Sequence, residues 1–378
     1  MKTIYTFTKP TLTACFIALL FSCNKNPKTE ETRTSEMNDS IVTENTNMQL
    51  KPKGPAPAWA PTMKPEMQVV IEKLVSLNGK PIETLSAKEA RLQPTPTDAV
   101  MAVMKDYKMK IPAALCNIED KQIPVTGGTT TIRIYTPKEG AAPFPIIVYY
   151  HGGGFVIADI DVYNGGAQGL CEQTGAIVVS VEYPKGPEKK FPAAHNVAFE
   201  AYQWVIKNAA TFNGNPAKIA VAGESAGGNL AVNVSLMARD KKITMPLYAV
   251  LVYPVASNDM NSESYIKFAE AKPLSKAMMG WFVKNYLNSE SQSSDQRINL
   301  VKSNLTGFPK TLIIGAEIDP LQSEGKLLAD KLKAANVETS YELYTGVTHE
   351  FFGMAAVIPQ AKEAQALAAK KLKSAFGM

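Results

Sequence analysis

Along residues 129–378, short apolar runs alternate with longer amphipathic stretches, and this pattern predicts strands and helices in turn. Short continuous runs of β-branched and aromatic residues are typical of strands buried on both faces of a sheet, and they occur at 129–136, 144–150, 175–183, 218–223, 247–255, 310–317 and 339–345. Longer stretches with helical character separate most of them, at 162–174, 193–210, 226–239, 322–335 and 360–376. Strands and helices in alternation form a parallel sheet covered on both faces. The pattern therefore predicts an α/β fold with a mostly parallel central sheet.

Two further helical segments interrupt this order. The first, at about 58–118, contains the amphipathic stretches EMQVVIEKLVSL and TDAVMAVMKDY, and the second, at 257–300, contains SKAMMGWFVKNYL. Open α/β sheets bind their ligands outside the carboxyl ends of the strands. We therefore expect one domain spanning 58–378, in which both segments form a helical cap over that edge of the sheet.

The N-terminus has the pattern of an export signal. Lys2 and Lys9 precede the apolar run LTACFIALLF at 12–21, which is too short to span a bilayer comfortably. The run ends at LFSC, which resembles a bacterial lipoprotein signal whose cysteine, here Cys23, becomes the lipidated first residue of the mature chain. The alternatives are an ordinary cleaved signal or a weak membrane helix.

The residues after Cys23 have few large apolar side chains. Residues 24–57 are rich in Asn, Thr, Glu and Pro, and such a segment buries too little surface to offset the entropy of ordering it. We therefore predict a signal peptide at 1–22 and a flexible tether at 23–57. The expected location is the cell envelope, on the periplasmic or outer-membrane side, with the N-terminal lipid as the contact with the membrane.

Composition excludes several classes of protein. A chain of 378 residues that is 45% hydrophobic can bury a large core. Its net charge of +5 comes from scattered lysines rather than a basic stripe with aromatic residues, which disfavours nucleic-acid binding. The 3 histidines lie far apart, which argues against a structural zinc site. Cys116 and Cys171, which remain after the signal, have no C-x-x-C spacing, so buried free thiols are the default and pairing stays open.

The first chemical signal is VAGESAGGNLAV at 221–232. Gly223, Ser225 and Gly227 match G-x-S-x-G at the join between a predicted strand and a predicted helix, which is the context of a nucleophile elbow. The small residues permit a strained turn that exposes the serine Oγ. The structural alternative is an ordinary turn in which Ser225 caps the helix. A phosphate loop is disfavoured, because neither the G-x-G-x-x-G spacing nor the G-K-[ST] ending is present.

The second signal is HGGGF at 151–155, directly after the predicted strand 144–150. Glycines let the backbone approach a ligand and point N–H groups at it, and such donors stabilise the negative oxygen that forms during ester hydrolysis. We expect the amides of Gly153, Gly154 and Ala226 to form this oxyanion hole. A bare glycine turn is the alternative, which the presence of both motifs in one predicted sheet disfavours.

Together these motifs resemble the hormone-sensitive-lipase-like carboxylesterases of the α/β-hydrolase superfamily. The motifs that stand in the family's order, from about residue 60 to the C-terminus, are HGGGF, GESAGG, FPAA (191–194), AEIDPL (316–321) and THEFF (348–352). The resemblance implies an α/β-hydrolase fold with a helical cap that shapes the acyl site. It also implies Ser225 as the nucleophile, Asp319 as the acid and His349 as the base.

The chain departs from the family pattern at several positions. Members often carry Asp where Glu224 and Ser323 stand, Gly where Glu350 stands, and RLAPE where PKGPE occurs at 184–188. None of these departures removes a triad or oxyanion position. Glu224 and Glu350 adjoin catalytic positions, so we expect them to alter the local field and the substrate preference.

The order of residues along the chain supports the same triad. In α/β-hydrolases the serine precedes the acid and the acid precedes the histidine. His349 is the only histidine after Ser225, and Asp319 follows a predicted strand in a loop. A turn-forming Asp is the alternative for Asp319. Glu317 is the rival acid, which ranks second because it falls within the end of the strand.

The other two histidines have different expected roles. His151 opens the glycine loop, so we expect its side chain to brace that loop through hydrogen bonds. His195 lies near the start of an amphipathic helix, where we expect a solvent-facing or locally bonded side chain.

These observations predict a serine carboxylesterase that hydrolyses short to medium acyl esters through an acyl-enzyme intermediate. The expected partner is a small-molecule ester, and the reaction needs no cofactor. One alternative is an amidase or deacetylase that uses the same triad. The other is a non-catalytic ligand-binding homologue, although such proteins typically lose a triad member.

Overall fold

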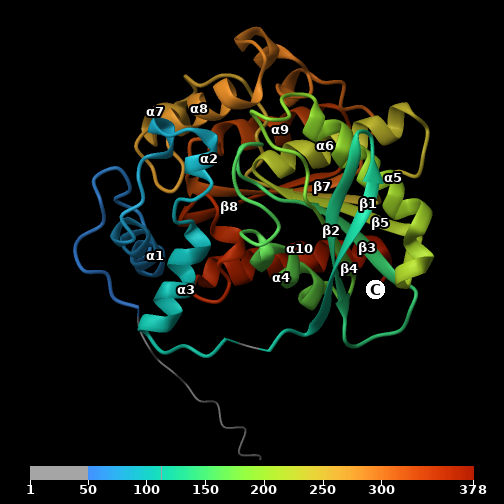
Figure 1. The fold of residues 1–378 in the computed structure, drawn as a ribbon, viewed down its shortest axis with the longest axis horizontal. Coiled ribbons are helices and arrows are strands. Elements are labelled where there is room, and N and C mark those ends of the chain that lie inside the picture. Colours follow the sequence, from blue (N-terminus) through green and yellow to red (C-terminus); the bar gives the residue numbers. More distant parts are fainter. Residues whose placement is uncertain (1–49, 112) are drawn as a thin grey trace, which may run out of the picture. The chain divides into compact units, whose positions relative to one another are not determined.

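The computed structural model describes residues 50–111 and 113–378; the predicted signal peptide, Cys23 and most of the predicted tether lie outside them. Eight strands form one sheet in the order β1-β2-β4-β3-β5-β6-β7-β8 (Figure 1). The strands are β1 (Cys116–Val125), β2 (Gly128–Pro137), β3 (Phe144–Tyr150), β4 (Ile177–Val181), β5 (Gly214–Glu224), β6 (Tyr248–Val252), β7 (Lys310–Ile318) and β8 (Thr339–Thr348).

The helices alternate with the strands after β3, as the sequence predicts. They are α1 (Pro65–Ser76), α2 (Ala87–Ala90), α3 (Pro96–Asp106), α4 (Asn164–Thr174), α5 (Ala193–Asn208), α6 (Ala226–Asp240), α7 (Glu263–Lys267), α8 (Lys276–Tyr286), α9 (Gln322–Ala334) and α10 (Pro359–Phe376). Short 3₁₀ turns are η1 (Ile82–Thr84), η2 (Ala209–Phe212), η3 (Glu290–Ser294), η4 (Leu300–Lys302) and η5 (Phe351–Gly353).

The sheet is parallel from β4 through β8, and its first two strands are antiparallel. β1 and β2 form a hairpin, and β2 pairs antiparallel with β4. β3 lies between β4 and β5, where Tyr150 is opposite Val181 on one side and Gly223 on the other. The prediction of a mostly parallel sheet is therefore confirmed. Its consequence for function is that the ends of β5, β7 and β8 lie at one edge.

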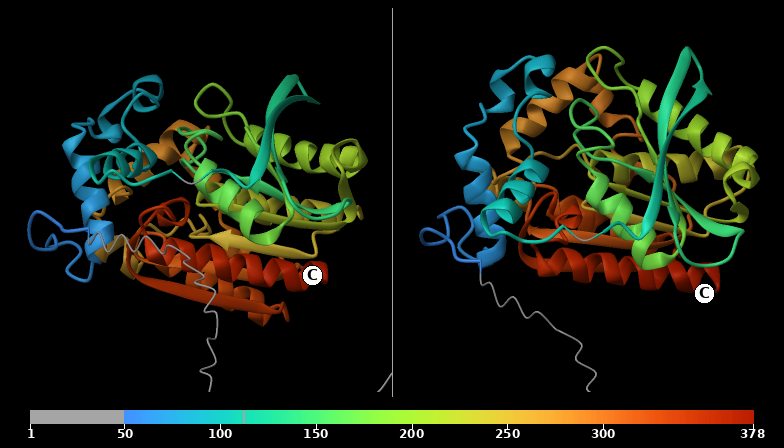
Figure 2. Two further views of the ribbon diagram at one scale, coloured as in Figure 1. Left: turned by 90° about the horizontal axis from the view of Figure 1, so that it is seen from below. Right: turned by 60° about the horizontal axis from the view of Figure 1, so that its bottom comes forward.

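Each face of the sheet packs against its own layer of helices. In β3, Ile146 and Val148 belong to the core shared with α5, α6 and α9, whereas Ile147 and Tyr149 belong to the core shared with α4 and α10. Successive side chains of a strand point to opposite faces, so a continuous apolar run serves both layers. Figure 2 shows α10 running along the face of the sheet away from α5 and α6.

The two segments that interrupt the alternation meet each other. Trp281 Nε1 in α8 donates a hydrogen bond of 3.0 Å to the carbonyl of Leu85, just after η1. Figure 1 shows α2, α7 and α8 at the same end of the sheet. In the other half of the first segment, α1 packs against α3 and also contacts β8. Parts of both segments therefore lie at one end of the sheet that carries the motifs.

Two boundaries differ from the sequence-based prediction. Residues 116–125, partly assigned to the first helical segment, form the edge strand β1; only Cys116 and Ile123 of this strand are buried, so it lacks a continuous apolar run.

The predicted tether is too long, because residues 50–57 pack on α1. Leu50 is buried, and the Lys53 amide donates to the Glu72 carboxylate at 2.9 Å. Within the described ranges, no helix is long and apolar enough to cross a membrane.

Candidate active site

Ser225, Asp319 and His349 each directly follow a strand of the parallel sheet. They come after β5, β7 and β8, whose carboxyl ends share one edge. Ile318 pairs with Thr348, so the residues that follow these two are brought together. His349 Nδ1 lies 2.7 Å from Asp319 Oδ2. The exposed fractions are 5% for the serine, 0% for the aspartate and 3% for the histidine, so the site is shielded from bulk water.

The backbone at Ser225 adopts the strained turn that an elbow requires. Its φ of 55° and ψ of −118° lie in a region that residues with a side chain rarely occupy. The Ser225 amide donates to Val252 O at 2.9 Å, and its carbonyl accepts from the Val255 amide at 3.1 Å. Its side chain does not cap α6, so the alternative of an ordinary capped turn does not describe this residue. A Cβ at Gly227 would overlap Tyr150 O, which explains the glycine there.

The hydrogen bond between His349 and Asp319 determines which imidazole nitrogen can act as a base. A carboxylate accepts the bond, so Nδ1 carries the proton and Nε2 keeps its lone pair. Burial lowers the pKa of His349, but the charge and hydrogen bond of Asp319, together with the charges of Glu350 and Glu224, outweigh it and raise the pKa above its ordinary value. Glu317 instead accepts from Thr62 Oγ1 at 2.9 Å and the Gly346 amide at 2.7 Å. The structure thus places Asp319, not Glu317, beside the histidine.

A tyrosine supports the imidazole from the β6 side. The ring of Tyr253 lies 4.4 Å from the ring of His349, measured between centroids, and is tilted by 47°. Among the described residues, Ser225 Oγ makes no hydrogen bond to His349. In serine hydrolases this contact is often long until substrate binds, so the geometry is compatible with a base that closes on the serine during the reaction.

The glycine loop after β3 presents free amides next to the elbow. Gly153 and Gly154 have φ values of 100° and 58°, which glycine adopts without strain. The Gly153 carbonyl accepts from two amides, whereas in the described part of the chain the amides of Gly153 and Gly154 donate to no other residue. Ala226 begins α6, where the first amides of a helix lack a partner within it. A Cβ at Gly154 would overlap the ring of Phe282, so α8 covers this loop.

His151 makes the bracing contact that the sequence predicts. Its Nδ1 lies 2.7 Å from Gly152 O, and its ring stacks on Tyr183 with centroids 4.2 Å apart. The Tyr183 hydroxyl donates to His151 O at 2.7 Å and to Gly152 O at 3.1 Å. Burial lowers the pKa of His151, so the imidazole is neutral at pH 7. These contacts hold the start of the glycine loop in place.

The sequence predicts a solvent-facing or locally bonded side chain for His195; the first is wrong, because the side chain is only 1% exposed, and its partners are 34 and 91 positions away in the chain. Its Nε2 lies 3.0 Å from Asn229 Oδ1 in α6, and its Nδ1 lies 2.9 Å from the Tyr286 hydroxyl in α8. Tyr286 in turn stacks on Phe155 of the glycine loop, with centroids 4.4 Å apart. His195 therefore joins the helix that follows the nucleophile to the helix that covers the loop.

Sequence reasoning marked Glu224 and Glu350 as unusual but did not find their partners. Glu224 accepts hydrogen bonds from the hydroxyls of Tyr149 and Tyr253. Glu350 accepts one from the Tyr163 hydroxyl at 2.9 Å. These tyrosines belong to other strands and loops, so no local pattern connects them to the glutamates.

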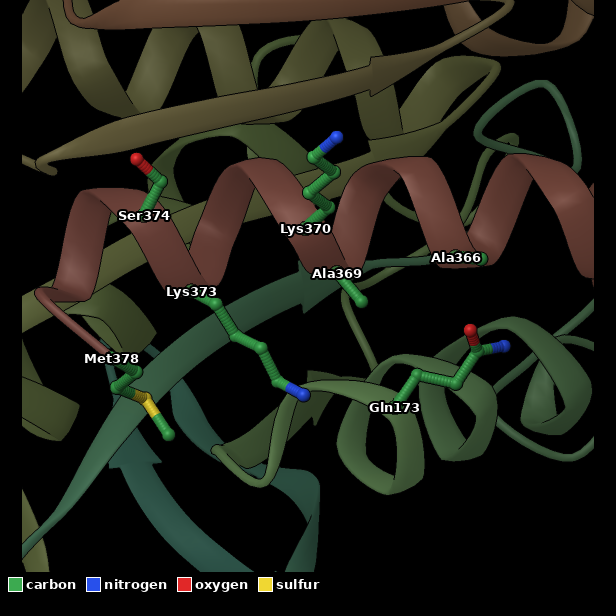
Figure 3. Close-up of a pocket in the computed structure, with 7 residues that line it drawn as sticks. All are labelled: Gln173, Ala366, Ala369, Lys370, Lys373, Ser374 and Met378. Atoms are coloured by element: carbon green, nitrogen blue, oxygen red, sulfur yellow. The ribbon is translucent and has the colours of Figure 1, made fainter.

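A hollow between α4 and α10 contains none of these residues. Figure 3 shows Lys373 on α10 pointing toward α4, which carries Gln173, whereas Lys370 points away from α4; Met378 lies at one end of the hollow. The hollow lies between the C-terminal end of α4 and the C-terminal half of α10, two helices that cover one face of the sheet. Its lining includes Ser374 but none of the triad or glycine-loop residues described above.

The chain is similar to known α/β-hydrolases and esterases. A family model described as alpha/beta hydrolase fold matches residues 147–353. Carboxylesterase NlhH of Mycobacterium tuberculosis is 33% identical over 264 residues, which are 68% of this chain and 83% of the relative. Ethyl acetate hydrolase of Pseudomonas putida is 28% identical over 297 residues, 78% of this chain and 92% of the relative. A thermostable esterase from Pseudomonas putida superposes with a TM-score of 0.77 at 28% identity, covering 84% of this chain and 99% of its own.

A mostly parallel sheet with a serine elbow, a His–Asp pair and a glycine loop at one edge defines an α/β-hydrolase fold with the parts of a serine hydrolase. Within that superfamily, the chain belongs to the hormone-sensitive-lipase-like carboxylesterase family.

Proposed function

We propose that Ser225, His349 and Asp319 hydrolyse carboxylic esters as a catalytic triad. The chain is a carboxylic ester hydrolase of its family, as the relatives and structural neighbours named above support. The observation that carries the residue assignment is the 2.7 Å contact between His349 Nδ1 and Asp319 Oδ2, at the sheet edge that also holds the strained serine.

In acylation, His349 Nε2 takes the proton from Ser225 Oγ as this oxygen attacks the ester carbonyl. The resulting imidazolium is stabilised by Asp319, which stays ionised. Negative charge forms on the carbonyl oxygen, and the amides of Gly153, Gly154 and Ala226 are the donors available to it. Because these donors are held in place before the reaction, they need little reorganisation when the charge forms.

The tetrahedral intermediate then collapses. Its C–O bond to the alcohol breaks, and the imidazolium returns the proton to the departing alkoxide oxygen, which leaves the acyl group on Ser225. In deacylation, His349 takes a proton from water, whose oxygen attacks the acyl carbonyl in the same oxyanion hole. The acid leaves and Ser225 Oγ regains its proton, so each atom is accounted for without a cofactor.

We further propose that the preferred substrates carry short to medium acyl chains. The support is the close cover of the site by α8, where Phe282 packs on Gly154 and Trp281 bonds to the first cap segment. Two relatives are named for small esters, ethyl acetate hydrolase of Pseudomonas putida and acetyl esterase of Salmonella schwarzengrund. Bulky aromatic side chains over the site narrow the space for the acyl group, so this cover favours a short acyl chain over a long one.

An activity screen over p-nitrophenyl esters of increasing acyl length tests both proposals. We expect hydrolysis of the shorter esters by the wild type and its loss in Ser225→Ala. Matched ester and amide pairs separate an esterase from an amidase or deacetylase. Absence of turnover of every ester by the wild type would favour the non-catalytic alternative, and faster hydrolysis of emulsified long-chain triglycerides than of dissolved short esters would overturn the acyl preference.

The lipid anchor at Cys23 remains a proposal with its own test. The LFSC stretch and the polar residues that follow it support a lipidated mature N-terminus in the cell envelope. Cys23→Ser should move the protein from the membrane fraction to soluble or unprocessed material. Unchanged fractionation, with no lipid on the mature N-terminus by mass spectrometry, would count against the anchor.

A further inference from the structure

Glu224, the residue before the nucleophile, is a buried carboxylate with two tyrosine donors. It ends β5 and is 1% exposed. Tyr149 donates its hydroxyl proton to Oε1, and Tyr253 donates its hydroxyl proton to Oε2. A Cβ at Gly166 in α4 would overlap Oε1, so a glycine in the neighbouring helix leaves room for this arrangement. Each carboxylate oxygen thus has its own donor from a different element.

Tyr253 connects this carboxylate to the catalytic base. Its ring is packed against His349, with centroids 4.4 Å apart. Its backbone has a φ of 35°, unusual for a residue with a side chain, and its amide donates to Ile314 O. The hydroxyl is held by Glu224. Loss of that bond would free the ring that supports one face of the imidazole.

Tyr149 connects the same carboxylate to the oxyanion loop. It is the second-to-last residue of β3, and HGGGF starts two positions later. Glu224, which directly precedes the nucleophile Ser225, is therefore bonded to the strand that leads into the glycine loop. One side chain holds the strand that leads to the oxyanion donors and the ring that contacts the base.

A second carboxylate, Glu350, follows His349 in the chain and also raises the pKa of the imidazole. Its backbone has a φ of 65°, and it accepts from the Tyr163 hydroxyl. A Cβ at Gly152 would overlap that hydroxyl, so Tyr163 also touches the glycine loop. The titratable groups that interact with Glu224 come from β3, from the residue before α4 and from the residues after β6 and β8: Tyr149, Tyr163, Tyr253, His349 and Glu350.

We propose that Glu224 is a positioning residue of the ester hydrolysis reaction, which holds Tyr253 against His349 and, when ionised, stabilises the imidazolium that forms during acylation. The proposal rests on the proposed triad. A carboxylate suits this place because two hydroxyl donors need two acceptors, whereas a glutamine offers one acceptor and one donor group. The longer glutamate reaches two tyrosines from the end of β5, which the shorter aspartate found in many family members is less able to do.

The electrostatic setting agrees with this role. Burial raises the pKa of Glu224 to about 7, against the opposing effect of the two tyrosine hydrogen bonds. The charge of Glu350 raises it further, and a protonated His349 lowers it. Protonation of the imidazole and ionisation of Glu224 therefore favour each other, because opposite charges stabilise one another at short range.

The test compares Glu224→Gln, Glu224→Asp and Tyr253→Phe with a control, Tyr202→Phe. The control residue, Tyr202, is a buried tyrosine in α5, away from the triad. Its hydroxyl, which the substitution removes, donates to Thr244 O at 2.8 Å. The measurements are kcat and KM for p-nitrophenyl acetate and the pH profile of kcat/KM. Circular dichroism checks the fold of each variant.

We expect Glu224→Gln to lower kcat by about tenfold with KM changed less than about twofold, because the interaction acts mainly in the transition state. The acidic limb of kcat/KM should move to lower pH, since loss of a negative charge lowers the pKa of the imidazole. In Glu224→Asp, which keeps the negative charge, the acidic limb of kcat/KM should stay close to its wild-type pH although kcat falls. Tyr253→Phe should lower kcat by several-fold, and the control should match the wild type.

The proposal is overturned if Glu224→Gln keeps the wild-type kcat and acidic limb. If Glu224→Gln does not fold, Tyr253→Phe decides: a kcat equal to that of Tyr202→Phe overturns the proposal. A lower kcat with an unchanged pH profile in every Glu224 variant would show a purely structural role and also overturn it. Activity that survives in Ser225→Ala would instead overturn the triad, so the two failures are distinguishable.

Discussion

His195 is a buried histidine whose proton the surrounding hydrogen bonds assign. Asn229 Nδ2 donates to Val255 O at 3.0 Å and to Ile298 O at 3.2 Å, which turns Oδ1 toward the imidazole. Because an amide oxygen only accepts, His195 Nε2 carries the proton and Nδ1 accepts from the Tyr286 hydroxyl. The side chain is thus satisfied in its neutral form.

Burial makes this histidine a source of acid sensitivity. It lowers the pKa of His195 from 6.5 to about 4 in the folded protein. As pH falls, the unfolded chain binds a proton on this residue before the folded one does. The stability that depends on neutral His195 is therefore complete above pH 6.5 and is lost as pH falls toward 4. With about 1.4 kcal/mol for each pKa unit, the loss is roughly 3 kcal/mol.

Urea unfolding of the wild type and His195→Gln at pH 7.5 and pH 4.5 measures this effect. Glutamine offers one donor and one acceptor but does not titrate. The wild type should lose roughly 2–3 kcal/mol more than His195→Gln between the two pH values. Other acid-sensitive groups cancel in this comparison, because they are common to both proteins. Equal losses, within about 0.5 kcal/mol, would refute the reasoning, since ordinary surface substitutions cause effects no larger than that.

The remaining predictions concern the site. His349→Ala should lower kcat by about 10⁴–10⁶-fold, and a folded variant that keeps more than about a tenth of the wild-type kcat would contradict the triad. His151→Ala removes the contact with Gly152 O, so kcat on a short ester should fall only partially. Gly154→Ala puts a methyl group into the Phe282 ring at a φ of 58° and should lower kcat by about 10²-fold; a wild-type kcat would exclude the loop as oxyanion donor. The acidic limb of kcat/KM should have its midpoint above 6.5, because Asp319 raises the pKa of His349; a midpoint below 6.5 would contradict this.

Local patterns were sufficient for most of the sheet and its helices. The continuous apolar runs that became β3, β5, β6 and β7 are buried in the structure, and such runs need no knowledge of distant residues to be recognised. β1 was missed because most of its side chains are exposed at the edge of the sheet, where polar residues are tolerated. The end of the tether was misplaced for a related reason: the packing of Leu50 and Lys53 depends on α1, not on their own neighbours in sequence.

The sequence by itself determined the order of the site's motifs along the chain. It also placed Ser225 at a strand-to-helix join and left one histidine, His349, after that serine in the chain. Those features depend on short spacings and on the order of residues along the chain, both of which can be seen in the amino-acid sequence. Only the tertiary structure decided that Asp319 rather than Glu317 lies beside His349, that His195 is buried between α6 and α8, and that Glu224 is held by Tyr149 and Tyr253. These contacts join residues that are 29 or more positions apart in the chain, so hydrogen bonding and burial select them only after the sheet has brought its strands together.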